Sequence, residues 1–206
     1  MPDTTPDLPA LHTGELFVCN SPELFRLQME YRALIHQYNQ MDPRDTDGHV
    51  ALLPRIFADV GEGCFLEPPF YANWGCFTHL GNNVYANFGL TLTDDTHIYI
   101  GDNVMLGPHV TIATAAHPIH PGLRRKAVQY NKPVTIGPNV WVGAGATILP
   151  GVTIEENTVI GAGSLVTRDI PANVVAMGSP CRVVRPIGGE DLTRYDHGRP
   201  IPPEFL

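Results

Sequence analysis

Branched aliphatic residues recur at every sixth position through one stretch of the chain, residues 134–166. The members of this series are Ile136, Val142, Ile148, Ile154, Ile160 and Val166. A period of six fits neither the 3.6-residue period of an amphipathic helix nor the two-residue alternation of a half-buried strand. It is typical of a chain that turns a corner every six residues and points one aliphatic side chain inward from each face. Three faces close a triangular coil of about 18 residues, so this stretch predicts a parallel β-helix of stacked coils.

The same period begins earlier in the chain and slips by two residues at two places. Its earlier members are Val60, Leu66 and Ala72, then Leu80, Ala86 and Leu92, then Ile100, Leu106 and Ile112. We interpret each slip as a loosened corner. The pattern predicts about three coils before residue 112 and about two after residue 134, hence about five coils in a mainly β domain over residues 60–187.

The period fails between residues 113 and 133, which hold three prolines, two histidines and four basic residues. The positions where the period would continue carry Pro118, Arg124 and Tyr130, which are not typical core residues. We interpret residues 113–133 as a loop extruded from an otherwise continuous solenoid. Long loops inside compact domains are usually functional, so this loop is a candidate site.

A helix is predicted soon after the N-terminus. Ser21 is a good N-cap, Pro22 is tolerated at the first helical position, and Glu23 suits the first turn. Apolar residues then follow at helical spacing, and they are Leu24, Leu27, Tyr31, Leu34 and Tyr38. Such a stripe forms one face of an amphipathic helix.

Four segments are therefore expected along the chain. A flexible arm over residues 1–12 precedes a helical segment over residues 13–59. A second short helix is expected within residues 49–59, with Pro54 either in its first turn or breaking it. The β-helix follows, and a polar tail over residues 188–206 has little to bury.

Composition argues against several classes of function. The 206 residues include 21 acidic and 13 basic side chains, giving a net charge of −8, whereas nucleic-acid binding favours a basic face. The cysteines match no zinc-binding spacing and the chain is too long for a disulfide scaffold, so we expect free thiols. No apolar run approaches the length of a membrane span, and the N-terminus lacks the order of a signal peptide. We expect a cytoplasmic protein with no membrane partner.

Several short motifs are more specific than the repeat itself. They include Tyr85-Ala86-Asn87-Phe88, His117-Pro118-Ile119-His120, Asn139-Val140-Trp141-Val142-Gly143 and Gly178-Ser179-Pro180-Cys181-Arg182. With these motifs, and with its N-terminal helix, the chain resembles the maltose/galactoside O-acetyltransferases of the hexapeptide-repeat acyltransferase superfamily. The resemblance implies a left-handed β-helix, acetyl-CoA as acyl donor, no metal ion, and a homotrimer with sites between neighbouring subunits.

His117 is the candidate catalytic base. It lies in the extruded loop, and an imidazole that titrates near neutral pH suits proton abstraction from a hydroxyl. The resemblance places the family's catalytic histidine at this position. We expect His117 to deprotonate the acceptor hydroxyl, which attacks the thioester directly without an acetyl-enzyme. The alternative is a loop histidine that fixes the turn before Pro118, and His120 is expected to be structural or a neighbour of the substrate.

The resemblance also implies an acceptor site. Asn87 and Asp95 match the family's substrate-binding positions, and an amide and a carboxylate both make directed hydrogen bonds to hydroxyls. Asn73 takes a position where the family often has a small hydroxyl residue, and Gln129 lies in the loop at a substrate-lining position. Cys19 stands where similar proteins place an aspartate, which leaves the sugar open. The alternatives are a corner residue bonded to its own backbone for Asn87 and a solvated turn for Asp95.

Coenzyme A is long and polyanionic, and a second set of residues matches the family positions that contact it. These positions are Ala144, Ala162, Thr167, Arg168, Arg182 and Arg185. A guanidinium suits phosphate geometry, although ordinary surface arginines are the alternative. The backbone N–H of Ala144 is a candidate oxyanion donor, and Trp141 either forms a wall of the cleft or simply packs.

The predicted function is acetyl transfer from acetyl-CoA to a hydroxyl of a sugar or a sugar-like acceptor. One alternative is transfer to another acceptor, such as an aminosugar or an oligosaccharide. A second is a zinc enzyme like the gamma-class carbonic anhydrases, which use three histidines on a similar solenoid. The histidines available for such a site are His79, His97, His109, His117 and His120. A third is a non-catalytic trimeric scaffold.

Overall fold

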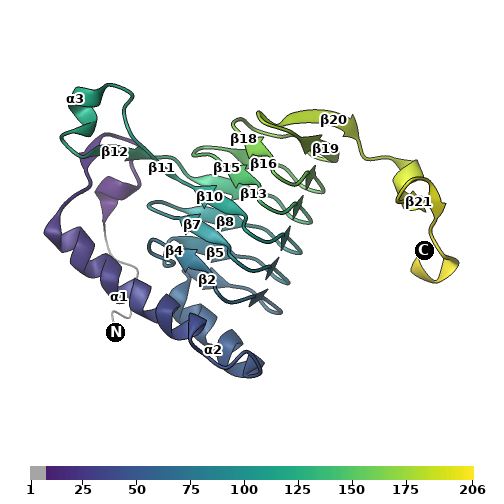
Figure 1. Ribbon diagram of the computed structural model, residues 1–206, viewed down its shortest axis with the longest axis horizontal. Coiled ribbons are helices and arrows are strands. Elements are labelled where there is room, and N and C mark those ends of the chain that lie inside the picture. Colours follow the sequence, from purple (N-terminus) through teal and green to yellow (C-terminus); the bar gives the residue numbers. More distant parts are fainter. Residues whose placement is uncertain (1–7) are drawn as a thin grey trace.

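Three parallel β-sheets enclose one interior in the computed structural model, which describes residues 8–206 (Figure 1). The first sheet contains β2 (Asp59–Val60), β5 (Thr78–Leu80), β8 (Ile98–Ile100), β13 (Val134–Ile136) and β16 (Thr153–Ile154). The second contains β3 (Phe65–Leu66), β6 (Tyr85–Ala86), β9 (Met105–Leu106), β14 (Trp141–Val142), β17 (Val159–Ile160) and β19 (Val174–Met177), with β20 (Arg182–Pro186) added antiparallel. The third contains β4 (Tyr71–Ala72), β7 (Thr91–Thr93), β10 (Thr111–Ala113), β15 (Thr147–Ile148) and β18 (Leu165–Val166).

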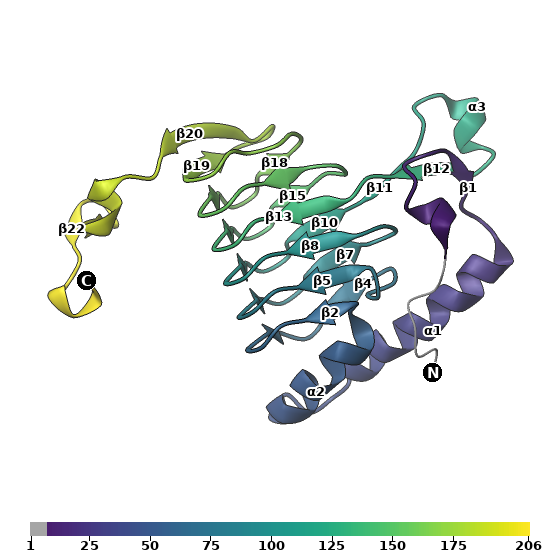
Figure 2. The same ribbon diagram turned by 180° about the vertical axis from the view of Figure 1, so that it is seen from behind.

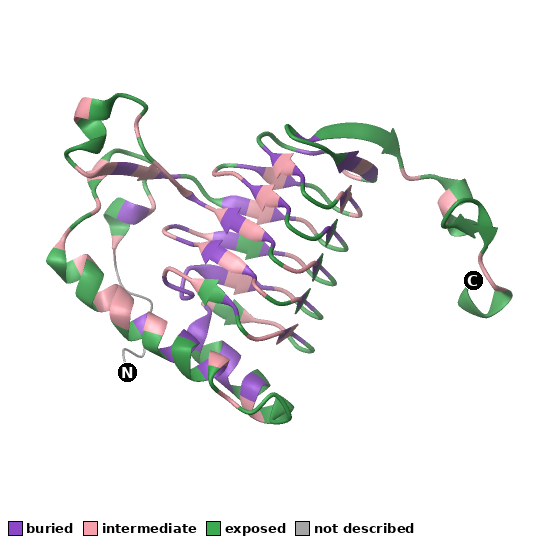
Figure 3. Ribbon diagram, in the orientation of Figure 1, coloured by how far each residue is buried: buried purple, intermediate pink, exposed green. Residues whose placement is uncertain are grey.

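The strand register confirms the six-residue period, including both slips. Within each sheet, the predicted core positions of successive coils pair with one another. In the second sheet the predicted positions Leu66, Ala86, Leu106, Val142 and Ile160 pair in series, and Ala176, which the period did not include, continues the series. These side chains are almost fully buried, and Figure 3 shows the buried positions recurring along the coils. Each coil therefore covers the apolar face of the next, which is how stacked repeats share one core.

The solenoid has about six turns rather than the five expected from the period. The additional turn is incomplete. Ile170 forms an isolated bridge with Ile154, and β19 pairs with β17. This turn is shorter than the others and departs from the spacing of six, so the sequence period alone did not reveal it.

One corner of the coil is built from a column of asparagines in the left-handed region of backbone space. Their φ angles lie between 55° and 59°, and the residues are Asn83, Asn103, Asn139, Asn157 and Asn173. Asparagine tolerates this conformation better than most residues. Side-chain amides also link neighbouring coils, as in the bonds from Asn139 to Asn157 and from Asn157 to Asn173, both 3.0 Å. The column repeats the corner without a glycine at each turn.

Two helices cover the N-terminal end of the solenoid, as Figures 1 and 2 show. Helix α1 (Pro22–Asn39) begins after Ser21, whose hydroxyl accepts the Leu24 N–H at 3.5 Å, which confirms the predicted cap. The Tyr38 hydroxyl is buried and donates to the carbonyl of Leu66 at 2.6 Å. Helix α1 is therefore attached directly to the first coil.

Helix α2 (Thr46–Ile56) starts earlier than expected, after the N-cap Asp45. Pro54 lies in its last turn, so the expectation that this proline occupies the first turn or breaks the helix is wrong. Proline lacks the N–H that would have bonded the carbonyl of Val50, so one helical hydrogen bond is missing, at a residue that is 45 % exposed. Leu53 and Ile56 of α2 are buried against the first coil.

The extruded loop forms a small antiparallel sheet of its own. Strands β11 (Ala115–Ala116) and β12 (Val128–Asn131) pair with each other, and α3 (Pro121–Arg124) lies between them. Strand β1 (Phe17–Val18) adds to the other edge of β12. This sheet was not predicted, because strands of two to four residues show too little alternation to stand out. It places the loop beside α1 (Figure 2).

The two terminal segments behave differently. The arm expected over residues 1–12 lies partly outside the described residues. Within the described part, η1 (Pro9–Leu11) buries Leu11, so this part is packed against the protein. The tail contains η2 (Gly189–Leu192), β21 (Arg194–Tyr195), β22 (Arg199–Pro200) and η3 (Pro203–Phe205), and it extends away from the coils (Figure 1).

None of the helices described within residues 8–206 has the length and apolar character needed to cross a bilayer.

Close contact between coils makes a clear prediction for Gly101→Ala. A Cβ at Gly101 would lie 2.7 Å from the backbone nitrogen of Pro138 in the next coil. We expect the substitution to lower the free energy of unfolding by about 1–3 kcal/mol in urea denaturation. Gly189→Ala, where no atom lies within 4 Å of an added Cβ, is the matched control. Equal stability of the two variants would contradict the prediction.

Candidate functional site

The carboxylate of Asp95 receives hydrogen bonds from three side chains. Asn73 Nδ2 and Trp74 Nε1 both donate to Oδ1 at 3.1 Å, and Gln129 Nε2 donates to Oδ2 at 3.1 Å. Asn73 and Trp74 directly follow β4, Asp95 follows β7, and Gln129 lies on β12. Asp95 is therefore more than a solvated turn residue, because it joins the solenoid to the loop sheet.

A second layer of contacts holds these donors. Gln129 Nε2 also donates to Asn131 Oδ1 at 2.8 Å, and Asn131 Nδ2 donates to the backbone carbonyls of Leu11 and Asp95. On the other side, Arg32 Nη2 donates to Asn73 Oδ1 at 2.8 Å.

Sequence analysis missed Arg32, Trp74 and Asn131. One signal was available for Asn131: it alternates with Gln129 along a short strand, and both side chains are buried. Polar residues at alternate positions of a strand share one face. No comparable local pattern marks Arg32 or Trp74.

The neighbouring Asp94 is buried, in contrast to Asp95, and its role is structural. It is fully buried and accepts hydrogen bonds from the backbone N–H groups of Trp74 and Gly75, at 2.9 and 2.7 Å, and from the Thr78 hydroxyl at 3.1 Å. Burial raises the pKa of Asp94 to about 7, and the negative charge of Asp95 adds to this effect while the three donors oppose it. Asp94 thus fixes the turn that supplies Asn73 and Trp74 to Asp95.

A cleft of about 420 Å³ lies between the N-terminal segment and this corner. Four of the five predicted acceptor residues line it, and they are Cys19, Asn73, Asp95 and Gln129. Burial raises the pKa of the Cys19 thiol, and the charge of Asp95 raises it further, so the thiol is protonated at neutral pH. The cleft therefore offers hydrogen-bonding groups of the kind that a polyol needs.

Asn87, the fifth predicted acceptor residue, does not line this cleft. Its Oδ1 accepts the backbone N–H of Phe88 at 2.8 Å. This is the local corner contact that the sequence left as the alternative for Asn87.

His117 follows β11 and is exposed at the base of the extruded loop. Its Nδ1 lies 2.9 Å from the carbonyl oxygen of Val128. A carbonyl can only accept, so Nδ1 carries the hydrogen in this contact and the neutral ring presents Nε2 as a lone pair. Within one chain, His117 is not among the residues that line the cleft. His120 has a structural contact, because its Nδ1 accepts the Gly122 N–H at the start of α3.

The predicted coenzyme positions lie along the later coils. Ala144 and Ala162 are exposed at equivalent corners of neighbouring coils, since the Gly163 N–H donates to the Ala144 carbonyl at 2.8 Å. Trp141 is 50 % exposed on β14, and Thr167 and Arg168 are exposed just after β18. Small exposed residues at successive corners leave room for an extended ligand along the coil.

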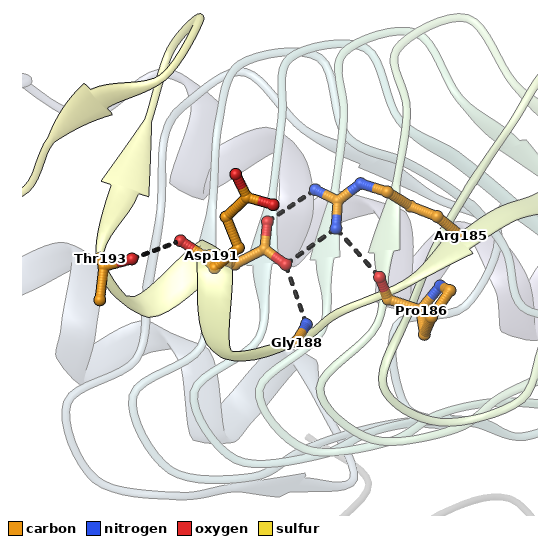
Figure 4. A network of polar contacts seen from close by, with 6 residues as sticks. Arg185, Pro186, Gly188, Asp191 and Thr193 are labelled. Atoms are coloured by element: carbon orange, nitrogen blue, oxygen red, sulfur yellow. Dashed lines mark hydrogen bonds and ion pairs between the residues drawn. The ribbon is translucent and has the colours of Figure 1, made fainter.

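The two predicted phosphate-binding arginines lie on β20 and are both exposed. Arg182 donates to the carbonyl of Cys181 at 2.7 Å. Arg185 makes a two-pronged ion pair with Asp191, with Nη1 and Nη2 at 2.8 and 2.7 Å from its oxygens (Figure 4). These bonds hold the pKa of Asp191 at about 2, and the Gly188 N–H contributes as well. Sequence analysis did not anticipate Asp191, which lies in the tail.

Two of the histidines considered as metal ligands bond to each other instead. His79 Nε2 lies 3.0 Å from His97 Nδ1, and Asp59 contacts the other nitrogen of His79 at 2.6 Å. The His12 ring stacks on His97 with 4.6 Å between centroids. Burial lowers the pKa of both His12 and His97. Across residues 8–206, no three histidine, cysteine or acidic side chains are grouped to hold a metal ion.

A coil of six-residue repeats closed by two N-terminal helices defines a class, the hexapeptide-repeat transferases. The sequence bears this out. Residues 133–168 match the family described as bacterial transferase hexapeptide (six repeats), and residues 11–61 match the maltose acetyltransferase hexapeptide capping motif. The second match covers the helical segment that closes the first coil.

Two curated relatives and one solved structure narrow the class. The chain is 52 % identical over 192 residues to a galactoside O-acetyltransferase of Lactococcus lactis, covering 93 % of each chain, and 44 % identical over 185 residues to that of Escherichia coli, covering 90 % and 91 %. It superposes on a galactoside acetyltransferase in complex with coenzyme A with a TM-score of 0.91 and 42 % identity, covering 97 % and 100 %. The chain belongs to the galactoside and maltose O-acetyltransferase family and is an acetyl-CoA-dependent acetyltransferase.

The raised pKa of Asp94 predicts a pH-dependent contribution to stability. Between the ordinary value of 3.8 and about 7, the folded protein holds a proton on Asp94 that the unfolded chain has lost. This stabilisation is complete below the ordinary pKa and disappears as the pH rises through about 7. We expect the free-energy advantage of wild type over Asp94→Asn to shrink by about 2 kcal/mol between about pH 5.5 and about pH 8. Urea titrations at both pH values measure this advantage, and an unchanged advantage would refute the assignment.

Proposed function

We propose that the protein transfers the acetyl group of acetyl-CoA to a hydroxyl of a sugar, with His117 as the general base. The observation that carries this proposal is the contact between His117 Nδ1 and the Val128 carbonyl. It fixes one tautomer, so that Nε2 is an acceptor on an exposed side chain. A positioned imidazole of this kind suits proton abstraction from a hydroxyl near neutral pH.

The proposed reaction is a direct attack. As His117 Nε2 removes the proton, the hydroxyl oxygen forms a bond to the thioester carbonyl carbon, and the carbonyl electrons move onto its oxygen. The backbone N–H of Ala144 is the proposed donor to that oxyanion. When the intermediate collapses, the carbon–sulfur bond breaks, and the coenzyme thiolate takes the proton from the imidazolium. His117 returns to its neutral form, and no acetyl-enzyme is required.

The cleft supports a sugar as the acceptor. Asp95, Asn73 and Gln129 combine carboxylate and amide groups in one half-buried corner, and these groups pair well with hydroxyls. Phe17, Leu24 and Phe25 supply an apolar wall, which suits the C–H face of a sugar ring or an apolar aglycone. Two relatives are named galactoside O-acetyltransferases, which favours a galactoside as the first acceptor to test.

We further propose a homotrimer in which His117 of one subunit faces Asn87 and Asp95 of the next. Two observations support shared sites. His117 does not line the cleft of its own chain. In addition, the outer face of the second sheet carries exposed apolar side chains in register, namely Tyr85, Met105 and Trp141. An exposed apolar row of this kind is typical of a protein interface.

Removal of the base tests the mechanism. We expect His117→Ala to lower kcat for galactoside acetylation by about 10² or more, because it removes the imidazole proposed to take the hydroxyl proton. The measurement is free-thiol release from acetyl-CoA in the presence of galactosides, glucosides, free sugars and aminosugars. His120→Ala, in the same loop, is the control and should keep near wild-type activity. Acceptor-dependent release that is indifferent to His117 would refute the mechanism.

The ion pair in Figure 4 predicts an effect of Asp191 on coenzyme binding. If Arg185 binds the 3′-phosphate, Asp191 competes for the same guanidinium edge and repels the phosphate. Because an exposed ion pair is weak, we expect Asp191→Asn to tighten coenzyme A binding only modestly, by up to about fivefold. Calorimetric titration with coenzyme A and with 3′-dephospho-coenzyme A measures this, and only the former should change.

Asp196→Asn is the control for this experiment. It removes the same charge from the same tail at a residue that does not contact Arg185. Equal tightening by both variants, or equal tightening for both coenzymes, would contradict the assignment of Arg185 to the phosphate.

A further inference from the structure

We propose that Arg32 is a positioning residue of the acceptor site, which orients Asn73 and through it the carboxylate of Asp95. The proposal rests on the proposed function, since it assigns Arg32 a part in holding the sugar. Arg32 lies on α1, which together with α2 forms the helical cap over the first coil. The residue therefore belongs to the cap and not to the coil. Its guanidinium reaches the corner after β4, where Nη2 lies 2.8 Å from Asn73 Oδ1 and Nε lies 3.4 Å from the Asn73 carbonyl.

The chemistry of these groups permits one orientation of the Asn73 amide. A guanidinium only donates, so the amide oxygen must face Arg32. The amide nitrogen then faces Asp95 and donates to Oδ1 at 3.1 Å. Rotating the amide by half a turn would oppose two donors at Arg32 and two acceptors at Asp95. Arg32 and Asp95 therefore determine the orientation of Asn73 together.

This orientation decides which part of Asp95 is open to a ligand. A carboxylate offers about four lone-pair directions. Asn73 and Trp74 occupy both directions of Oδ1, and Gln129 occupies one direction of Oδ2. The remaining direction on Oδ2 can accept a hydroxyl of the sugar. Without Arg32, the Asn73 amide can turn away, Oδ1 loses a donor, and the carboxylate is free to rotate.

The charges around the cleft indicate that Arg32 serves this corner. Among the residues that line the cleft, Arg32 and Asp95 are the two charged side chains. No carboxylate of residues 8–206 forms an ion pair with Arg32. By contrast, Arg26 on the same helix pairs with Glu30 at 2.7 Å and is 65 % exposed. Arg26 is therefore a matched control for the loss of an arginine from α1.

The test compares Arg32→Met with Arg26→Met, using methyl β-galactopyranoside as the acceptor. We expect Arg32→Met to raise the acceptor KM about tenfold while the KM for acetyl-CoA stays unchanged, because a hydrogen bond from a charged donor is stronger than one between neutral groups. Arg26→Met should match wild type. Arg32→Lys should recover part of the loss, since an ammonium can still donate to Asn73. In an Asn73→Ala background, Arg32→Met should have no further effect.

A second readout does not depend on catalysis. The side-chain amide signal of Asn73 in a ¹H–¹⁵N spectrum, identified by its loss in Asn73→Ala, should shift in Arg32→Met and stay in place in Arg26→Met. An unchanged acceptor KM together with an unchanged Asn73 signal would overturn the proposal. If wild type acetylates none of the sugars, the proposed function is refuted, and the Asn73 signal alone then decides whether Arg32 orients this corner.

Discussion

The spacing between neighbouring coils is the constraint on which the rest of the structure depends. Strand hydrogen bonds set this spacing at about 4.8 Å, which leaves no room for a side chain at the positions that directly follow the strands of the first sheet. Added Cβ atoms at Gly61, Gly81 and Gly101 would lie 2.5 to 2.7 Å from backbone or side-chain atoms of the next coil. The same spacing stacks the inward aliphatic side chains into continuous columns. The same spacing therefore requires aliphatic residues at the inward positions and glycine at the closest corners.

Segments outside the coil need contacts of another kind, and two consecutive carboxylates provide them. Asp94 points inward and fixes the turn after β4, while Asp95 points outward and receives side chains from that turn and from the loop sheet. The helical cap contacts this corner through Arg32, and the loop sheet contributes Gln129 and Asn131 to the same hydrogen-bond network. The cleft that we propose as the acceptor site therefore lies where three separate parts of the chain meet one corner of the coil.

The fold could be predicted closely because burial imposes a period. The register from Leu66 through Ile160 follows the sequence pattern, including both slips, since each inward position must be apolar. The end of the coil escaped the pattern, because the turn containing Ile170 departs from that spacing. Pro54 shows the limit of local rules, because a proline in the last turn of α2 removes only one helical hydrogen bond, the one to Val50 on an exposed part of the helix.

The candidate site could be predicted only in part, for a related reason. The residues named from motifs and resemblance include four that line one cleft, but the contacts that orient them are long-range and polar. Arg32 and Asn73 are 41 residues apart, and nothing periodic joins them. The contact between Arg185 and Asp191 is short in sequence, but it depends on the path of the tail. Hydrogen-bond partners of this kind can be identified only once the folded geometry is known, whereas core positions can be identified from the sequence period alone.

The proposed coenzyme side and the proposed acceptor side of the site differ in how strongly the stacking of the coils restricts their sequence. Ala144 and Ala162, the proposed donor-side residues, lie on the coil itself, where a Cβ added at the adjacent Gly143 would lie 2.5 Å from the backbone nitrogen of Ala162. A side chain at Gly143 would therefore disturb the contact between two neighbouring coils. The proposed acceptor-side residues come from the N-terminal segment, the corners after β4 and β7 and the loop sheet, which lie outside the stacked core. Substitutions such as the cysteine at position 19 can alter the cleft without altering the coil, so acceptor preference can diverge on a constant fold.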